Sequence, residues 1–279
     1  MTRLAAYLAR IGLSAAPPVS PQGLALLQSA HRQAIGFENF DSFFHARVAI
    51  DAESVFAKLV TGRRGGYCFE HNRLFADMLS ELGFTVRPLL ARVWLGLRPG
   101  IDAVPPRTHT LLLVETDDGP WIADAGFGGS FVPPMPLTEG AGATTADGAR
   151  HRLCRSPHEW GEWLLERAGP TAATDGRAAP HGDWQPQYGF CLTPVAPDDL
   201  ELANLWTASR PGIRFTTLRI ASIVLPDGFA ALGDRTLTVY RDGECERHDI
   251  ASAADFRLLL SNLCHIDLSD DEVAALGLF

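Results

Sequence analysis

The sequence contains no long apolar run and no secretory leader pattern. No stretch of about 18 consecutive apolar residues, the length that a transmembrane helix needs, occurs in the 279 residues. The opening MTRLAAYLARIG instead spaces Leu4, Leu8 and Ile11 at helical intervals with arginines on the other side. This pattern is typical of an amphipathic helix and not of a signal peptide. We therefore expect a cytoplasmic protein that does not bind membranes.

Basic residues are also in short supply. The chain has 24 Lys and Arg against 33 Asp and Glu, a formal net charge of -9. Nucleic acids and anionic lipids are bound by a concentrated Lys/Arg face, so we expect neither as a partner. An anionic ligand would have to be met locally, by Arg63 and Arg64 or by N–H groups of glycine-rich turns.

Paired cysteines are the third absence. The five cysteines form an odd, scattered set, namely Cys68, Cys154, Cys191, Cys245 and Cys264. This is the wrong pattern for a disulfide framework and favours a reducing compartment. Cys68 and His71 form a C-x-x-H pair, but no second pair with zinc-ligand spacing accompanies it, so we expect no metal. One cysteine is then available for reactivity.

The remaining composition is that of a folded enzyme-sized chain. Hydrophobic residues make up 46% and charged residues 20%, unlike a disordered protein. Apolar residues recur at helical spacing over residues 4–11, 23–35, 52–60 and 69–82. Gly83 stands where a helix C-cap glycine is expected. We assign residues 1–84 to a helical domain.

From residue 85 the apolar runs shorten to strand length. Expected strands cover residues 86–97, 108–115, 121–125, 160–166 and 188–192. Asp118 and Gly119 are the expected hairpin turn between the second and third of these. Stretches rich in glycine, alanine, threonine and proline predict loops at 140–148 and 169–182. Residues 85–193 therefore form an expected β-rich domain.

The last part of the chain mixes both patterns. We expect a helix near 198–207, strands over 215–225 and 236–241, and one or two helices from residue 253. Residues 194–279 are assigned to a mixed α/β domain. The expected fold class is α+β, with helical, β-rich and mixed parts in chain order.

Cys68 lies in RRGGYCFEHN, after two glycines and before a helix. A cysteine at a helix N-terminus faces unpaired N–H groups and the positive end of the dipole, which favour the nucleophilic thiolate. A lone cysteine is more often a small core residue, but this setting favours reactivity. Gly65 and Gly66 suggest a close backbone approach by a ligand.

A thiolate nucleophile needs a histidine, and the histidine needs an acid to orient it. His109 lies in the expected strand THTLLLVE, and Asp124 ends the next strand. With a two-residue turn at Asp118 and Gly119, Asp124 would pair with Leu113, roughly 13 Å along the strand from His109. A bulge, a longer loop or a different register must close that gap.

These residues carry a family resemblance. RGGYCFEHN around Cys68, PRT before His109 and DAGFGG from Asp124 closely resemble the arylamine N-acetyltransferases. Further landmarks similar to that family are YLARIG at 7–12, IGFENF at 35–40, ARVW at 91–94 and residues 204–215. The likeness covers nearly the whole chain.

The resemblance implies a papain-like core with a Cys-His-Asp triad of Cys68, His109 and Asp124. It implies ping-pong transfer of an acetyl group from acetyl-coenzyme A to arylamines, arylhydrazines or arylhydroxylamines, a reaction of xenobiotic metabolism, without a bound cofactor or metal. By the same likeness, an acceptor pocket is lined by Val93, Phe127 and Phe215. The turn of Gly126, Gly128 and Gly129 would lie beside coenzyme A.

Three positions depart from the family pattern. Gly36 and Phe40 stand where the family often has proline and leucine, and Ala125 replaces a common valine. These changes bear on substrate preference more than on mechanism. Two other activities fit the same triad: an amide synthase acting on carrier-bound acyl chains, and a thiol hydrolase. A homo-oligomer is a further expectation.

Overall fold

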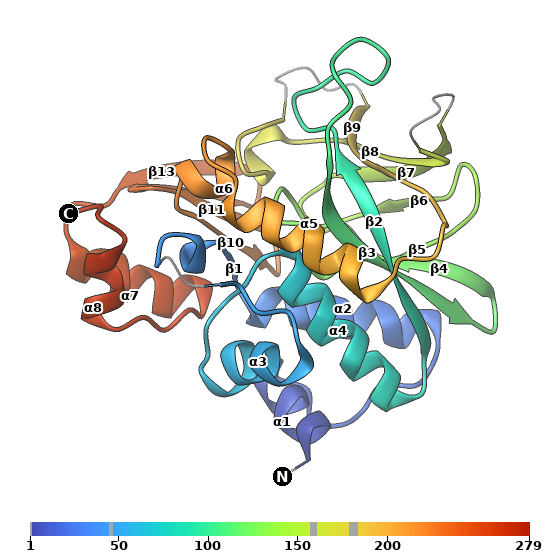
Figure 1. Cartoon of the computed structure of the whole chain (residues 1–279), viewed down its shortest axis with the longest axis horizontal. Helices are drawn as coiled ribbons and strands as arrows, with labels where there is room; N and C mark the ends of the chain where they lie inside the picture. Colours follow the sequence, from blue (N-terminus) through green and yellow to red (C-terminus); the bar gives the residue numbers. More distant parts are fainter. Residues whose placement is uncertain (1, 45–46, 157–160, 179–183) are drawn as a thin grey trace.

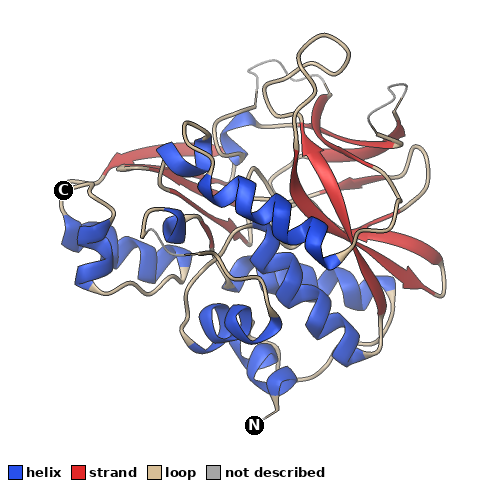
Figure 2. Cartoon of the chain, viewed as in Figure 1, coloured by secondary structure: helices blue, strands red, loops and turns tan. Residues whose placement is uncertain are grey.

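The structure is a computed structural model that describes residues 2–44, 47–156, 161–178 and 184–279. Helices gather at the base of the molecule, one sheet rises above them and a second sheet lies to the side, next to the C-terminal helices (Figures 1 and 2). This arrangement confirms the α+β class. Among the described residues, no helix is long and apolar enough to cross a membrane.

The N-terminal helices pack around α4. They are α1 (Arg3–Arg10), α2 (Pro21–Ala34), α3 (Ala52–Phe56) with a π-helical turn (Ala57–Thr61), and α4 (Cys68–Leu82). α4 begins where Glu70 accepts a hydrogen bond from the Tyr67 N–H at 3.0 Å, and it ends at Gly83 with a φ of 102°. The predicted C-cap glycine is thereby confirmed. Leu74, Phe75 and Met78 bury the inner face of α4 in the helical core.

The larger sheet has eight strands in the order β5-β4-β3-β2-β9-β8-β7-β6. Its strands are β2 (Thr85–Val93), β3 (Arg107–Thr116), β4 (Gly119–Ala123), β5 (Met135–Pro136), β6 (Gly142–Thr144), β7 (Arg150–Arg155), β8 (Trp163–Ala168) and β9 (Gln185–Phe190). The sheet is antiparallel and barrel-like (Figure 1). β5, β6 and β7 have no counterpart among the expected strands. The expected strand start at Trp160 and loop end at Gly182 lie outside the described residues.

The second sheet has the order β1-β10-β11-β12-β13. It contains β1 (Phe37–Glu38), β10 (Ile220–Leu225), β11 (Gly228–Gly233), β12 (Thr236–Arg241) and β13 (Glu244–Asp249). α7 (Ala253–Cys264) and α8 (Asp270–Ala275) follow it in the chain. Apolar side chains from this sheet and from both helices share one core with Phe40, so the departure at Phe40 is a packing residue.

Two helical segments connect the sheets, α5 (Pro197–Ser209) and α6 (Arg214–Thr217). The strand expected over 215–225 is therefore wrong at its start, because Phe215 lies in α6 and the strand begins at Ile220. β1 comes from the N-terminal part of the chain and pairs with β10, so Phe37 lies opposite Ser222. The domain boundaries at residues 84 and 193 stay a prediction.

The expected hairpin turn is also wrong. Thr116 pairs with Gly119 and Leu113 with Ile122, so Asp117 and Asp118 form the turn. Gly119 has a φ of 100°, which only glycine adopts readily, and it therefore closes the hairpin from the position after the turn. The true register moves the end of β4 two residues closer to the start of β3.

Candidate functional site

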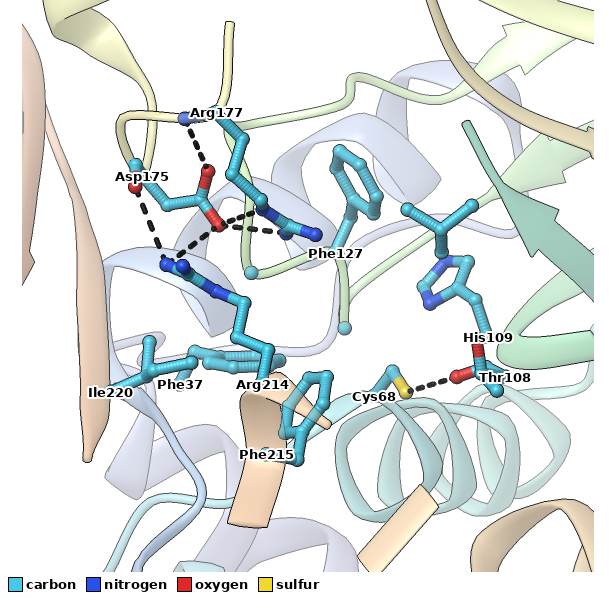
Figure 3. Close-up of a pocket in the computed structure, with 13 residues that line it drawn as sticks. Phe37, Cys68, Thr108, His109, Phe127, Asp175, Arg177, Arg214, Phe215 and Ile220 are labelled. Carbon is cyan, nitrogen blue, oxygen red and sulfur yellow. Dashed lines mark hydrogen bonds and ion pairs between the residues drawn. The ribbon is translucent and has the colours of Figure 1, made fainter. Parts of the chain in front are cut away.

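Cys68 is the first residue of α4 and is buried, with 3% of its surface exposed. Its Sγ lies 3.7 Å from the Thr108 carbonyl, beside the start of β3 (Figure 3). The turn after β4 packs tightly against it, because a Cβ at Gly126 would lie 2.7 Å from the Cys68 Cα. Only glycine permits this contact. The start of α4 is thus held between the ends of β3 and β4.

The glycines before Cys68 have a different role from the one expected. A Cβ at Gly65 would lie 2.3 Å from the Gly36 carbonyl, and one at Gly66 would lie 2.9 Å from a Glu70 carboxylate oxygen. The close approach comes from the protein's own chain and not from a ligand. These glycines bring β1 against the start of α4, through a bridge between Phe37 and Gly66.

His109 and Asp124 meet through the register of the β3–β4 hairpin. Continuing the observed pairs places Asp124 opposite Leu111, two residues from His109 and on the same face of the sheet. Such diagonal neighbours are within reach of long side chains. Nε2 of His109 lies 2.7 Å from Oδ2 of Asp124, and both side chains are buried. Of a bulge, a longer loop and a different register, it is the different register that brings Asp124 to His109.

Two further side chains fix the orientation of Asp124. Asn72, one helical turn after Cys68, donates to Asp124 Oδ1 at 3.1 Å, and the Gly126 N–H donates to the same oxygen at 2.9 Å. Gln28 of α2 accepts from the Asp124 N–H at 2.8 Å. The second carboxylate oxygen is thereby left for His109. Asn72 and Gln28 were missed from the sequence, because neither has a motif that points to a distant aspartate.

The electrostatics favour a charged pair. Burial by itself would lower the pKa of His109, but Asp124 and the hydrogen-bonded Cys68 side chain raise it to about 10. Burial would raise the pKa of Asp124, yet His109, Asn72 and the Gly126 N–H hold it below its usual range. At neutral pH the pair is therefore imidazolium and carboxylate. Since Asp124 engages Nε2, Nδ1 is the ring nitrogen left for Cys68.

A pocket opens in front of Cys68 and His109, with a volume of about 80 Å³. Its walls include all three expected acceptor-pocket residues, Val93, Phe127 and Phe215. Gly126 and Gly128 also line it, whereas Gly129 is not among the lining residues and Asp124 lies behind His109. Figure 3 shows Phe127 and Phe215 on opposite sides of the opening toward Cys68. Aromatic faces thus surround the reactive atoms.

The rings around His109 hold the imidazole in place. Phe127 lies edge-on to it at 5.3 Å between centroids, and Tyr188 lies at 5.0 Å. Burial and the adjacent Asp124 carboxylate raise the pKa of Tyr188 well above its usual value, so its hydroxyl stays protonated. These contacts restrict rotation of the histidine and exclude water from the His109–Asp124 bond.

The pocket also contains residues that sequence reasoning missed. Phe37, Asp175, Arg177, Arg214 and Ile220 complete its walls. Asn39, in the stretch IGFENF, donates to the carbonyls of Phe215 at 3.0 Å and Leu218 at 2.8 Å. This asparagine explains one landmark motif, because it anchors the segment that carries Phe215 and Arg214. The sequence signal that could have pointed to Arg214 is its position shortly after the turn residues Pro211 and Gly212.

His71 and Arg64, which lie outside the pocket, bond to the protein's own groups. Within the part of the chain that the structure describes, no group of three or more His, Cys, Asp or Glu side chains is placed to hold a metal ion. His71 hydrogen-bonds to His31 at 2.8 Å and to the Gly36 carbonyl at 3.1 Å, as a packing residue does. Arg64, which the sequence offered as a contact for an anionic ligand, instead pairs with Glu38 at 2.7 Å.

Comparison with known proteins places the chain in a family. The profile of the N-acetyltransferase family matches residues 22–273. The chain is 36% identical to an arylamine N-acetyltransferase of Mycolicibacterium smegmatis over 271 residues, 96% of this chain and 93% of the relative. It is 40% identical to one from Escherichia coli K12 over 233 residues, 83% of this chain and 75% of the relative.

Solved structures agree. An arylamine N-acetyltransferase from Salmonella typhimurium superposes with a TM-score of 0.87 at 31% identity, over 100% of this chain and 99% of the other. The enzyme from Mycobacterium marinum in complex with CoA superposes with a TM-score of 0.84 at 32% identity, over 98% of each chain. Such values over whole chains mean that this chain shares the fold of these enzymes along its full length.

Proposed function

The chain belongs to the arylamine N-acetyltransferase family, and from this premise we propose that it transfers an acetyl group from acetyl-coenzyme A to an aromatic amine, hydrazine or hydroxylamine. The transfer proceeds by a ping-pong mechanism through an acetyl-Cys68 intermediate. One observation carries the proposal: Cys68 and His109 line the same aromatic pocket, and Asp124 bonds to His109 from behind. The enzyme is an acyltransferase.

In the first half-reaction, Cys68 attacks the thioester carbonyl. The positive charge of His109 and the positive end of the α4 dipole both lie beside the sulfur that attacks. The bond between the carbonyl carbon and the coenzyme sulfur breaks as the new thioester forms. His109 then donates its Nδ1 proton to the leaving coenzyme A thiolate, which leaves neutral imidazole. One thioester replaces another, so the acetyl group keeps its transfer potential.

In the second half-reaction, the aromatic amine attacks acetyl-Cys68. Aromatic amines are neutral near pH 7 but poor nucleophiles, so removal of the amine proton during attack contributes about 10²- to 10⁴-fold. Neutral His109 accepts that proton at Nδ1, and Asp124 stabilises the resulting imidazolium through Nε2. Cys68 leaves as the thiolate. The enzyme returns to its starting charge state.

The lining of the pocket suggests where the aromatic amine and coenzyme A each lie. Val93, Phe127 and Phe215 are proposed to contact the aromatic ring, since all three line the space in front of Cys68. Gly126, Gly128 and Gly129 are proposed to lie beside coenzyme A, where a turn without side chains allows a close approach. Acetyl-coenzyme A serves as a co-substrate and not as a resident cofactor. A cytoplasmic location and a homo-oligomer remain part of the proposal.

The decisive experiment separates the two half-reactions. With acetyl-coenzyme A alone, mass spectrometry should show one added acetyl group, and peptide mapping should place it on Cys68. Adding aniline or phenylhydrazine should discharge the adduct and produce an equal amount of acetylated product. Cys68→Ala should form no adduct. Cys245→Ala removes an exposed free cysteine and should behave as the parent.

Other outcomes would replace the proposal. If no adduct forms with acetyl-coenzyme A but one forms with a carrier-bound acyl chain, the protein is an amide synthase. If the adduct decays to acetate at one rate whatever amine is added, it is a thiol hydrolase. Adduct on Cys154 or Cys191 in place of Cys68 would remove the proposed nucleophile.

A further inference from the structure

A buried arginine lies on the face of α2 that holds Asp124. Gln28 on that face accepts from the Asp124 N–H at 2.8 Å and donates to the Val132 carbonyl at 2.6 Å. Arg32 follows Gln28 by one helical turn, so the two side chains share a face. Long side chains on a helix point back toward the preceding turn. The guanidinium of Arg32 is therefore carried toward the segment that begins with Asp124.

The guanidinium of Arg32 is enclosed by the fold. The residue is 1% exposed, and neither Nη1 nor Nη2 donates to an acceptor among the residues that the structure describes. Arginine is almost never fully buried without a partner, because the loss of solvation and the loss of hydrogen bonds both cost free energy. A group kept in place at such a cost is a candidate for a functional role.

Asp124 is the anion that acts on this cation. Burial lowers the pKa of Arg32 to about 10, whereas the carboxylate of Asp124 raises it. Arginine stays protonated in proteins, so Arg32 is a cation at neutral pH. Both residues are buried, and solvent therefore screens their interaction little.

The interaction is one of charge and not a hydrogen bond. The oxygens of Asp124 are engaged by Asn72, the Gly126 N–H and His109. Arg32 thus leaves the orientation of the carboxylate to these groups. What it adds to Asp124 is a positive potential from the side opposite the pocket.

Two histidines lie near Arg32, and both are neutral. His31 precedes it on α2 and bonds to His71 of α4 at 2.8 Å. Burial is the main reason that the pKa of each imidazole is well below its usual value, and Arg32 is among the charges that lower it further. These histidines therefore do not offset the charge of Arg32 at neutral pH.

Around His109, acetylation leaves Asp124 as the charged neighbour. Tyr188 packs on the imidazole, and its hydroxyl stays protonated because burial raises its pKa. Cys68 loses its ionisable proton once it carries the acetyl group. In the acetyl-enzyme, the protonation of His109 is thus governed by Asp124 and by Arg32 behind it.

The charge of Arg32 matters most between the two half-reactions. His109 gives its proton to the coenzyme A thiolate and must then stay neutral until the amine attacks, since only neutral imidazole can accept the amine proton. Asp124 by itself favours the imidazolium, which would form by uptake of a proton from water and block the second half-reaction. A cation near Asp124 opposes that uptake.

We propose that Arg32 is a positioning residue that acts through Asp124: its buried charge keeps the carboxylate ionised and opposes reprotonation of His109 in the acetyl-enzyme. The proposal rests on the proposed acetyltransferase function. Arg32 is not among the residues that line the pocket. It therefore sets the pH at which the second half-reaction proceeds and not the substrates that the pocket accepts.

The test follows the discharge of acetyl-Cys68 as the pH is varied. The enzyme is acetylated with acetyl-coenzyme A, freed of excess donor and mixed with aniline, which is uncharged at neutral and alkaline pH. The discharge rate, measured by mass spectrometry, should rise with pH to a plateau. Arg32→Met should move the midpoint of this rise upward by about one pH unit, which makes discharge about tenfold slower below the midpoint. The plateau should be at least parental.

Three further variants separate charge from structure. Arg32→Gln is a second neutral variant and should move the midpoint as Arg32→Met does, whereas Arg32→Lys keeps a cation and should restore part of the parental profile. The matched control is Arg73→Met. Arg73 follows Asn72 on α4, but its side chain is 42% exposed and pairs with Asp77 at 3.1 Å. Solvent screens this charge, so its loss should leave the profile unchanged.

Stability provides a second readout. Loss of a buried charge whose terminal nitrogens have no acceptor should raise the urea midpoint of Arg32→Met or leave it unchanged. An unchanged pH profile in the two neutral variants would overturn the proposal, and a lower urea midpoint would then assign Arg32 a structural role. An equal shift in Arg73→Met would overturn it as a long-range charge effect. Failure of the acetyltransferase function would look different, because the parent would form no acetyl-Cys68 to discharge.

Discussion

Two clusters of buried charge lie on either side of the first turn of α4. We call them the cleft cluster, which consists of Cys68, His109 and Asp124, and the ionic cluster, which consists of Glu38, Asp41, Lys58, Arg64 and Glu70. The same helix turn serves both, since Cys68 begins it and Glu70 lies two residues later. The cleft cluster faces a pocket through Cys68 and His109.

The clusters differ in how many partners each charge has. In the ionic cluster, Lys58 contacts Glu70 at 2.6 Å and Asp41 at 2.7 Å, while Arg64 contacts both Glu38 and Asp41. In the cleft cluster, His109 has one carboxylate, and its second nitrogen is left for the substrate side. Charges shared among many partners hold a fold together, whereas a charge with one partner and an open side can exchange a proton with a ligand.

The pKa values reflect the same difference. Burial would lower the pKa of Lys58, but Glu70, Glu38 and Asp41 together raise it. Burial raises the pKa of Glu70 to about 7 even though Lys58 lowers it. The ionic cluster thus contains one carboxyl that titrates near neutrality, and the cleft cluster contains an imidazole that titrates at about 10. Each cluster has its own pH window.

The largest effect is expected in the cleft cluster, from Asp124→Asn. Asn72 and the Gly126 N–H both donate to Oδ1, so the new amide must keep its oxygen there and turn its NH₂ toward His109. Nε2 would then accept, so His109 would become a neutral imidazole with its one proton on Nδ1. Such a ring cannot take a proton from Cys68, and it has lost the carboxylate that stabilises the imidazolium. Acylation of Cys68 should fall about 10⁴-fold, the scale of the same change in a serine protease triad. Single-turnover mass spectrometry measures it.

Asp147→Asn is the matched control for that change. Asp147 is also buried and lies 3.5 Å from Arg167, but it does not line the pocket. This variant should lose stability and keep parental acylation of the folded protein. Parental acylation by Asp124→Asn, at an unchanged melting temperature, would show that Asp124 only shapes the turn after β4.

A smaller and different effect is expected in the ionic cluster, from Lys58→Met. Asp41 would keep Arg64, but Glu70 would lose the cation that lies 2.6 Å away. Removing one member of a buried ion pair typically costs about 3–5 kcal/mol of unfolding free energy. Urea unfolding measures the loss, and Lys58→Met with Glu70→Gln should recover part of it. A large loss of acylation at unchanged stability would instead show that the two clusters act as one functional unit.

The smallest expected effect concerns the pH dependence of the free energy of unfolding, which should show two separate slopes. A folded-state pKa raised above the unfolded value means stability that is present below the unfolded pKa and lost as pH rises through the folded pKa. The contribution of Glu70 to the free energy of unfolding therefore falls as the pH rises from about 4.5 to about 7. The contribution of His109 falls as the pH rises from about 6.5 to about 10. Glu70→Gln should flatten the lower slope and Asp124→Asn the upper one in urea unfolding across that range. Flattening of both slopes by either variant would contradict separate clusters.

Much of the site was predictable because its signals are local. The glycines, the helix start and the apolar face after Cys68 lie within one segment, and α4 forms where that pattern placed it. His109 and Asp124 were recognisable as triad candidates, but their contact was not derivable. Moving the turn from Asp118–Gly119 to Asp117–Asp118 shifts the partner of Asp124 from Leu113 to Leu111, and local preference hardly distinguishes the two turns.

Other parts of the site come from segments that do not share a motif. Arg177 and Arg214 belong to different segments and meet at Asp175, and Asn39 anchors the segment that carries Arg214. In the sequence, Asn72 looks like an ordinary first-turn residue of a helix. Its hydrogen bond to Asp124, at the end of β4, is visible only in the fold. Helical or strand periodicity in the sequence does not predict contacts between such distant segments.

By itself, the sequence determined the family and the α+β class and pointed to Cys68 as the candidate nucleophile, because capping, periodicity and a long motif depend on neighbours in the chain. Only the tertiary structure decided which register brings Asp124 to His109, which charges have several partners, and which arginines line the pocket. Those outcomes depend on the packing of segments that are distant in sequence, where many weak contacts compete and only the assembled core selects among them.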